Sequence, residues 1–230
     1  MPLYAHSIPD LASVGRVLAD PTRAAMLVAL IDGKAWTPAE LARHVQISKA
    51  SATEHANKLV RSGLCGEVRQ GRHRYLRIAG GDVADAIEQL GALSGRLLAP
   101  APTLTASTRD EALRLGRTCY RHLAGRLGVT LTGEFRRVGL ISDAWELTPA
   151  GHAWFGELGI ETAARSRQPL VRPCLDWTER REHMAGRVGD AFCAHLEGTS
   201  WIVRRPSTRA VRLTSTGHQE LSARGLRLPS

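Results

Sequence analysis

Thiol, imidazole, carboxylate and indole side chains gather in two short stretches of the C-terminal half of this 230-residue chain. The first stretch reads RTCYRHLAG and the second reads RPCLDWTERREHMAG. Side chains of these types can bind a metal, react as thiols or line a pocket for a small molecule. The candidate effector-binding residues are Cys119, Tyr120 and His122 in the first stretch and Cys174, Asp176, Trp177, Arg181 and His183 in the second.

The spacing of these residues favours a pocket over a metal site. Trp177 and Arg181 are four residues apart and share a face if the segment is helical. Neither stretch holds the compact ligand pair of a zinc finger. We therefore expect a small organic effector near the two stretches, with no bound metal and no cofactor. A thiol- or metal-responsive site remains the alternative, and it would use Cys119, His122, Cys174 and His183.

A second group of polar and basic side chains lies in the N-terminal half, in the segment KASATEHANKLVRSG and in the basic segment after it. Side chains of these types reach base edges and phosphates in the major groove of DNA. The net charge of +9 also favours a polyanionic partner, because each cation near a phosphate releases a condensed counterion. The predicted DNA-contacting residues are Ser48, Lys49, Ser51, Thr53, His55, Asn57, Lys58, Arg61, Arg69, Arg72, His73 and Arg74.

Capping signals predict the helices that position this second group. Asp20-Pro21 begins one helix, Thr37-Pro38 with Glu40 forms a capping box for the next, and Ser48 begins a third. The following segment CGEVRQGRHRYLRI predicts two strands joined near Gln70-Gly71. Two helices, a tight turn, a third helix and a basic hairpin together predict a winged helix-turn-helix.

Two stretches of residues 10–95 match a known pattern, namely LADPTRAAMLVAL and ELARHVQISKASATEHANKLVRSGL. With the wing that follows, they resemble the ArsR-type winged-helix transcriptional regulators. The resemblance implies a dimeric DNA-binding protein, usually a repressor that an effector releases from DNA. Metal-sensing members often carry cysteines where this chain has Thr37-Pro38-Ala39, and others use histidine and acidic ligands on the dimer helix. That helix has Asp82, Asp85 and Glu88 here but no histidine, so neither familiar metal site of the family is present.

Apolar stripes on two predicted helices indicate a homodimer. Leu11, Val14 and Leu18 lie along the first helix, and a second helix runs from Val83 to Leu97. The resemblance implies that helices at these places pair two copies. Two copies would read a duplex with two-fold character, because each contributes one recognition helix to one half-site.

A heptad is repeated in the C-terminal half, as HLAGRLG at residues 122–128 and HMAGRVG at residues 183–189. After a Pro- and Thr-containing linker at 98–110, we expect two degenerate winged-helix-like repeats, at 111–160 and 161–230. The heptad is expected to form the positioning helix of each repeat, within a helix that runs from Arg109 to Arg126 in the first. The first repeat is about six residues shorter than the N-terminal unit at the recognition helix, which predicts a shortened helix that reads no DNA.

The predicted fold class is α+β, mainly α, with a DNA-binding and dimerisation domain at 1–97 and a sensing half after the linker. We expect a sequence-specific regulator, a repressor released by a small effector, and no enzyme, because no P-loop, GxGxxG, HExxH or GxSxG motif occurs. An architectural DNA-binding protein without an effector is the alternative from another class. The longest apolar run, residues 24–31, is too short to cross a bilayer, so we expect a cytoplasmic protein without a membrane partner.

Overall fold

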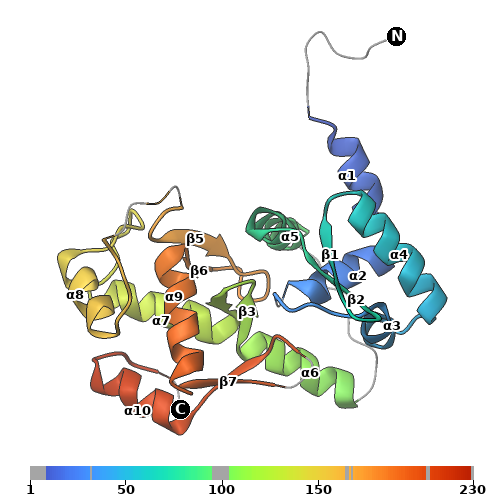
Figure 1. The fold of residues 1–230 in the computed structure, drawn as a ribbon. Helices are drawn as coiled ribbons and strands as arrows, with labels where there is room; N and C mark the ends of the chain where they lie inside the picture. Colours follow the sequence, from blue (N-terminus) through green and yellow to red (C-terminus); the bar gives the residue numbers. More distant parts are fainter. Residues whose placement is uncertain are drawn as a thin grey trace. The chain divides into compact units, whose positions relative to one another are not determined.

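A computed structural model describes residues 9–31, 33–94, 104–163, 166, 168–205 and 208–228. It divides into two compact units, Met1–Ala84 and Asp85–Ser230, whose helices and strands are shown in Figure 1. The division falls inside a helix. Of the linker expected at 98–110, residues 98–103 lie outside the described residues, and the rest form the start of a helix, α6 (Leu104–Leu115). The predicted boundaries at 97 and 110 therefore remain predictions. Among the described residues, no helix has the length and apolar character needed to cross a membrane.

The first unit is a winged helix-turn-helix. Its helices are α1 (Leu11–Leu18), α2 (Pro21–Leu30), α3 (Pro38–Val45) and α4 (Lys49–Arg61). The wing is an antiparallel hairpin of β1 (Cys65–Gln70) and β2 (His73–Ile78), and α5 (Gly81–Leu93) follows it. This order of elements confirms the fold predicted for the N-terminal half.

Side-chain caps begin α2, α3 and α4 where the sequence predicts them. Asp20, Thr37 and Ser48 each accept a hydrogen bond from the backbone N–H three residues on, and Glu40 completes the capping box with Thr37. Gln46 ends α3 in the left-handed conformation, with φ of 58°. Caps of this kind satisfy N–H groups that the helix leaves free. They therefore set the residue at which α4 starts.

Buried apolar side chains hold α4 against the rest of the first unit. Its inward side consists of Ala52, Ala56 and Leu59, all fully buried. The side chains around it are also fully buried, namely Met26, Leu27, Leu30, Leu41 and Leu76. The small alanines let α4 approach α2 and α3 closely, so its other side is left for solvent or a partner.

The second unit repeats one order of elements. After α6 (Leu104–Leu115), the first copy consists of β3 (Arg117–Cys119), β4 (His122–Ala124), α7 (Gly125–Arg137) and α8 (Pro149–Glu157). The second copy consists of β5 (Arg172–Leu175), β6 (Glu182–Ala185), α9 (Arg187–Gly198), β7 (Ile202–Arg204), β8 (Val211–Leu213) and α10 (Ser215–Ala223). Each hairpin is antiparallel, and an isolated bridge between Ile141 and Leu147 lies where the second copy has β7 and β8.

Matching local contacts recur in the two copies. A Cβ atom on Gly128 would lie 2.5 Å from the carbonyl oxygen of Leu123, and one on Gly189 would lie 2.8 Å from that of Met184. The two glycines occupy the same place in the repeated heptad. The last helices, α8 and α10, are both capped by a threonine side chain that accepts from a glycine N–H. The exact repeat boundaries, 111–160 and 161–230, remain predictions.

One apolar core joins the two copies. Phe135 of α7, Phe155 of α8 and Phe192 of α9 are buried and pack edge to face, with ring centroids 5.3–5.8 Å apart. Edge-to-face contacts of this kind add to the free energy gained from burial alone. Helices of the two copies therefore share this core, and a smaller separate cluster of Cys119, Ala124, Cys174 and Ala185 lies on the β3–β4 and β5–β6 hairpins.

The prediction that the heptad forms a positioning helix is wrong. His122 to Ala124 form strand β4, and helix α7 begins only at Gly125. Gly125 and the matching Gly186 have φ of 72° and 93°, a conformation that glycine adopts without steric cost. The repeated stretch therefore encodes a turn from strand to helix. The single helix expected from Arg109 to Arg126 is replaced by α6, the β3–β4 hairpin and the start of α7.

The predicted shortening of a recognition helix is also wrong. The helix α7 has 13 residues, as many as α4. Burial distinguishes the two helices, because Val129, Leu131 and Phe135 of α7 lie in the core. A count of residues between two matched points in the sequence cannot separate a shorter helix from a different order of elements.

Candidate functional site

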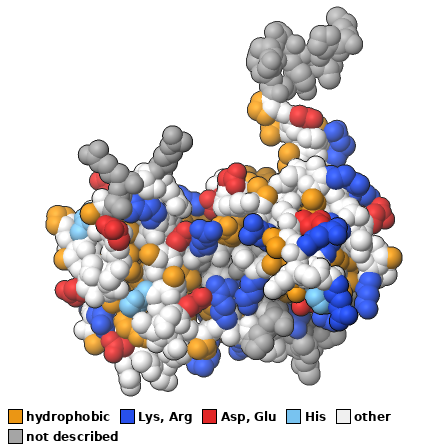
Figure 2. Space-filling view, in the orientation of Figure 1, with side chains coloured by type: hydrophobic (Ala, Val, Ile, Leu, Met, Phe, Trp, Pro, Cys, Tyr) orange, Lys and Arg blue, Asp and Glu red, His pale blue; other side chains and the backbone are white. Residues whose placement is uncertain are grey.

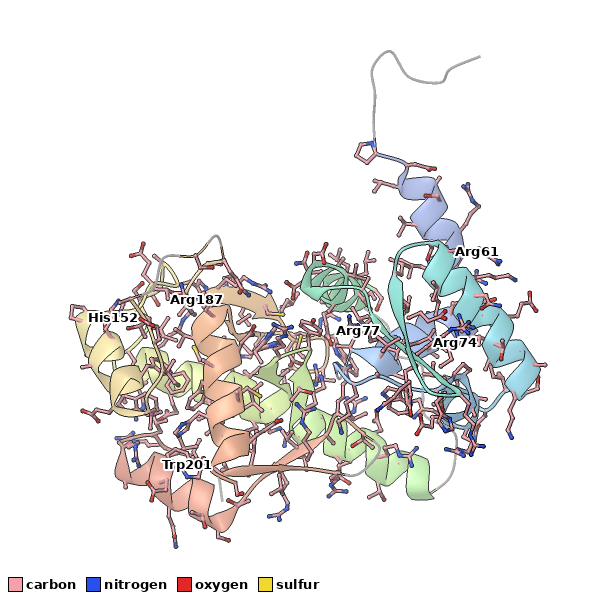
Figure 3. The ribbon with its side chains drawn as sticks, in the orientation of Figure 1. Arg61, Arg74, Arg77, His152, Arg187 and Trp201 are labelled. Carbon is pink, nitrogen blue, oxygen red and sulfur yellow. The ribbon has the colours of Figure 1, made fainter. Side chains whose placement is uncertain are left out.

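The free side of α4 is polar and basic. Lys49, Thr53 and Arg61 are exposed, and Ser48 and Ser51 lie at the N-terminal end of the helix. Figure 2 shows basic side chains over the part of the first unit that carries α4 and the wing, and Figure 3 labels Arg61. Side chains of this kind, on a helix fixed by a buried apolar side, suit contact with base edges and phosphates.

Three of the predicted DNA-contacting residues are engaged inside the first unit. The His55 side chain is only 15% exposed, and its Nδ1 lies 3.8 Å from a carboxylate oxygen of Asp20. Asn57 accepts a hydrogen bond of 2.7 Å from Arg74, which also forms an ion pair of 2.7 Å with Glu67. The expectation that His55 and Asn57 lie on the solvent side of α4 is therefore corrected. These contacts fix α4 against α2 and the wing.

The tip of the wing is exposed and basic. Arg69, Arg72 and His73 surround the turn at Gly71, whose φ is 57°. Arg69 forms an ion pair of 3.1 Å with Glu67, and this contact, with that of Arg74, lowers the pKa of the Glu67 carboxyl. The wing therefore carries both partnered cations and the freely exposed Arg72.

Some predicted cations are free and others are paired. Lys58 forms an exposed ion pair of 2.7 Å with Glu54 of the same helix. Within the described part of the chain, Lys49, Arg61 and Arg72 make no ion pair. A cation without an ion pair can contact a phosphate without first breaking a contact to a carboxylate of the protein. Lys49, Arg61 and Arg72 are therefore the cations best placed for a nucleic-acid contact.

Two cysteines and two histidines meet in the second unit. Cys119 pairs with His122 across the β3–β4 hairpin, and Cys174 pairs with His183 across the β5–β6 hairpin. The Sγ atoms of the cysteines are 3.9 Å apart, and the two imidazole rings are 5.1 Å apart between centroids. One sulfur or nitrogen atom from each residue lies within 4.8 Å of the others, and all four side chains are buried. We call these four residues the Cys/His cluster.

Each histidine of the cluster has a carboxylate beside one ring nitrogen. The Nδ1 of His122 lies 3.5 Å from Asp190, and the Nδ1 of His183 lies 3.5 Å from Asp176. Among the described residues, the Nε2 of His122 and both ring nitrogens of His183 make no hydrogen bond. Buried polar atoms nearly always have a partner, so such atoms require an explanation.

Contacts within the Cys/His cluster shift the pKa values of its side chains. The hydrogen bond to Cys174 and burial raise the pKa of the Cys119 thiol, and the bond from Cys119 lowers that of Cys174. Burial lowers the pKa of His122, but Asp190 and Cys174 outweigh it and raise that pKa to about 9.

Asp176 holds the two copies together beside the cluster. It is fully buried and accepts hydrogen bonds of 2.9 Å from Arg117 and 2.7 Å from the backbone N–H of Gly125. Burial raises its pKa, but Arg117 and these hydrogen bonds outweigh burial and hold the pKa well below its usual range. Arg117 is also fully buried, and the Trp177 ring lies 4.3 Å from its guanidinium.

The structure brings together only some of the predicted effector-binding residues. The Cys/His cluster and Asp176 converge, and Trp177 packs over Arg117. Tyr120 lies in the β3–β4 turn, and Arg181 is exposed near the end of the β5–β6 turn, so the helical face expected for Trp177 and Arg181 is wrong. The Cys/His cluster and Asp176 are buried, whereas Tyr120 and Trp177 are half-buried and Arg181 is exposed.

A cavity of about 380 Å³ lies elsewhere in the second unit. It includes none of the eight predicted effector-binding residues. Its lining residues are Ala112, Leu115, Arg126, Leu127, Thr130, Arg205, Val211, Arg212, Leu213 and Leu228. Apolar walls with three arginines would suit a small organic anion.

Strand register explains why spacing alone did not favour the Cys/His cluster, whose four residues the sequence offered only as the alternative site. The heptad repeat aligns His122 with His183, but the cysteines are six residues out of that alignment because the β5–β6 turn is longer. The signal that could have found the cluster is a cysteine directly opposite a histidine in each of two predicted hairpins. Ligands on paired strands are neighbours whatever the length of the turn.

A helix-turn-helix domain model matches residues 18–64. The chain is 37% identical over 214 residues to the uncharacterized HTH-type transcriptional regulator YdfF of Bacillus subtilis, a match that covers 91% of this chain and 94% of that protein. It is 38% identical over 80 residues to the HTH-type transcriptional regulator CmtR of Mycobacterium tuberculosis, covering 35% of this chain and 67% of CmtR.

The solved structures that match cover the winged-helix portion. The cadmium metal-sensor CmtR of Mycobacterium tuberculosis is 32% identical, with a TM-score of 0.33, over 41% of this chain and 97% of that one. The match to YdfF extends over nearly the whole length of both proteins. The chain therefore belongs to the family of HTH-type transcriptional regulators, with a winged helix-turn-helix in its N-terminal part and a further C-terminal unit.

Proposed function

We propose that this regulator recognises a specific DNA duplex through α4 and the wing, and represses transcription until an effector acts on the C-terminal unit. The observation that carries the DNA-binding part is the division of α4 into two sides. Ala52, Ala56 and Leu59 anchor one side, and Lys49 and Thr53 lie exposed on the other. A rigid helix with free polar groups of several types reads bases better than a uniformly basic surface does.

The wing supplies contacts of a different kind. Arg72 at its tip is exposed and makes no ion pair within the described part of the chain. An arginine on an exposed hairpin turn suits a phosphate contact, which positions a protein on DNA without reading its sequence. We therefore assign sequence reading to α4 and backbone contact to the wing.

Exposed apolar residues support a homodimer, which the two-fold operator requires. Leu11 of α1 is 76% exposed and Val14 is 38% exposed. On α5, Leu90 and Leu93 are 49% and 77% exposed. Large exposed apolar residues grouped on one helix mark a surface for a partner. Leu97, also expected on this surface, lies outside the described residues.

The effector proposal rests on the second unit. The convergence of the Cys/His cluster favours the thiol- or metal-responsive alternative over an organic molecule bound at the same residues. An organic anion in the cavity beside Arg126, Arg205 and Arg212 is a second candidate, supported by the shape and charge of that cavity. The two candidates use different residues, so variants separate them.

The test compares operator and random duplexes in a fluorescence anisotropy titration. Lys49→Ala should cost about 1–3 kcal/mol on the operator and less on random DNA, because a base contact is lost. Arg72→Ala should weaken both duplexes alike and reduce the slope of log affinity against log salt by about 1. Arg109→Ala, which removes an exposed charge from α6, is the matched control and should change neither.

An architectural protein would give another result. Equal losses on operator and random DNA from Lys49→Ala and Arg72→Ala, with no preferred sequence for the unchanged protein, would support the architectural alternative. A preference for one duplex that Lys49→Ala reduces would exclude it.

A further inference from the structure

We infer that the Cys/His cluster is a Zn²⁺ site, with Cys119, His122, Cys174 and His183 as its four ligands. The inference concerns metal binding by the second unit and does not depend on the operator binding proposed above. It differs from the metal positions expected on the winged-helix unit, where Thr37-Pro38-Ala39 and α5 lack the thiol or imidazole ligands. Two thiolates and two imidazoles are a ligand set that Zn²⁺ prefers for structural sites.

The distances within the cluster suit tetrahedral coordination. With Zn–S bonds of about 2.3 Å, two thiolates on one Zn²⁺ lie about 3.8 Å apart. The Sγ atoms of Cys119 and Cys174 are 3.9 Å apart. Zn–N bonds of about 2.0–2.1 Å place the remaining ligand atoms about 3.3–3.6 Å apart. All four ligand atoms lie within 4.8 Å of one another, so small side-chain rotations close the set.

The histidines are oriented as zinc ligands usually are. A ligating histidine commonly presents its second ring nitrogen to a carboxylate, which fixes the ring and its tautomer. His122 has Asp190 at 3.5 Å from Nδ1, and His183 has Asp176 at 3.5 Å from Nδ1. That leaves Nε2 of each ring for the metal. Neither Nε2 makes a hydrogen bond among the described residues, which a bound cation explains.

The charge and the burial of the cluster also favour Zn²⁺. Zn²⁺ with two thiolates is neutral overall, so the complex tolerates an apolar site better than free thiolates do. Both cysteines bind the metal as thiolates and both histidines as neutral imidazoles, and any proton that these groups still carry is released to solvent. The site offers four protein ligands and all four side chains are buried, which leaves no open position for a substrate. The metal would therefore stabilise or signal, and it would not catalyse.

The positions of the four ligands in the fold indicate a structural role for the metal. Each hairpin contributes one cysteine and one histidine, and the two hairpins belong to different copies of the repeated order of elements. Helix α7 starts directly after β4, and α9 starts just after β6. A shared metal fixes the two hairpins to each other and hence the starts of both helices.

The first experiment uses the unchanged full-length protein under reducing conditions. After a chelator has removed metals, Co²⁺ is added and the visible and near-ultraviolet absorption is followed. We expect saturation at one Co²⁺ per chain, with d–d bands of tetrahedral intensity and a thiolate-to-cobalt charge-transfer band, and displacement of both by Zn²⁺. A folded protein that shows no charge-transfer band overturns the inference without any variant.

The second experiment compares cysteine variants. Cys119→Ser should weaken metal binding at least about 100-fold, because a ligand is lost, whereas Cys193→Ser should bind as the unchanged protein does. Cys193 is the matched control, a thiol only 1% exposed on α9 and outside the cluster. His183→Gln should reduce affinity and keep both thiolate charge-transfer contributions. Equal loss in Cys119→Ser and Cys193→Ser overturns the inference.

Oxidation of Cys119 and Cys174 to a disulfide is the remaining outcome that the experiments must distinguish. If peptide mass spectrometry finds a Cys119–Cys174 disulfide and the reduced protein binds no Co²⁺, the cluster is a thiol switch and the zinc inference is wrong. Operator titrations on the same samples keep the two proposals apart. Operator binding without metal binding refutes the zinc site alone. A protein that binds metal, but whose metal-free and metal-bound forms both fail to prefer any duplex, refutes the proposed function alone.

Discussion

Replacement of Asp176 by asparagine tests how the second unit is held together. The carboxylate is fully buried and forms an ion pair of 2.9 Å with the equally buried Arg117. It also accepts a hydrogen bond of 2.7 Å from the backbone N–H of Gly125, at the start of α7. Asparagine keeps the shape of the side chain but removes its charge. The guanidinium of Arg117 is then left buried without a counter-charge.

The size of the effect follows from that uncompensated charge. Removal of one partner from a buried ion pair costs about 3–5 kcal/mol. For a domain of this size, 1 kcal/mol changes the Tm by about 2–4 °C, so Asp176→Asn should lower the Tm by about 6–20 °C. The pKa of Asp176 is held below its usual range in the folded protein. Its contribution is therefore complete above the unfolded pKa of about 3.9 and is lost only as the pH falls below that value. The difference between variant and unchanged protein should stay constant from about pH 5 to pH 8.

Tryptophan fluorescence during urea unfolding is the assay, since four of the five tryptophans lie in the second unit. Asp110→Asn is the control, because its ion pair with Arg114 is partly exposed and should be worth about 0.5 kcal/mol or less. The double variant Arg117→Met with Asp176→Asn should recover part of the loss, because the isolated charge is gone. A loss below about 1 kcal/mol for Asp176→Asn, or no recovery in the double variant, would refute the reasoning.

Three further outcomes are expected. In α7, Gly133→Ala should raise the free energy of unfolding by about 0.5–1 kcal/mol, since nothing lies within 4 Å of the new Cβ. Gly128→Ala should lower it by about 1–3 kcal/mol, because its Cβ would lie 2.5 Å from the Leu123 carbonyl oxygen. Paired urea titrations that rank the two variants the other way would contradict this expectation. Leu11→Asp should shift the protein from dimer to monomer in sedimentation velocity and weaken operator binding, and an unchanged dimer would exclude α1 from the interface. Thr37→Ala should cost about 1 kcal/mol by removing the capping box of α3, and an unchanged urea midpoint would show that this cap is dispensable.

Local signals predicted the first unit well because each acts over a few residues. The caps at Asp20, Thr37 and Ser48 form as predicted, and so does the tight turn of the wing at Gly71. The predicted solvent side of α4 was only partly right. His55 lies against Asp20, because a helix in a small domain has neighbours on more than one side. A single periodic pattern cannot show which intermediate positions those neighbours cover.

The second unit shows where sequence patterns stop being sufficient. The repeated heptad correctly marks equivalent places, but its Ala-Gly-Arg centre reads as helix when Gly125 and Gly186 in fact turn a strand into a helix. The strands of these hairpins have three or four residues, too few to show a clear alternation. Without predicted strands there is no register, so the sequence could name Cys119 and Cys174 together only as an alternative and could not place each cysteine opposite a histidine.

Helix α5 connects the Cys/His cluster to the part of the chain that carries the wing. Asp85 of α5 receives a hydrogen bond of 2.5 Å from Arg172, which lies on β5 two residues before Cys174. One turn later, the buried Glu88 receives a bond of 2.5 Å from Arg209, which also donates to the carbonyl oxygen of the residue before Cys119. Both cysteine-bearing strands are thus linked to one helix, which begins at Gly81, soon after the wing strand β2 ends.

An effector changes DNA affinity only if it binds one state of the protein better than another. If metal in the cluster is such an effector, the two ion pairs on α5 are the contacts we expect to carry its effect. We expect Asp85→Asn to leave Co²⁺ binding within about two-fold of the unchanged protein and to reduce the effect of metal on operator affinity. The coupling free energy between two such sites is commonly about 1–3 kcal/mol, so the change is measurable by anisotropy titration with and without Zn²⁺. Asp110→Asn, which removes an ion pair within α6, should leave the coupling intact. If Asp85→Asn retains the full response to metal, α5 does not carry the signal, and the metal acts on the second unit alone.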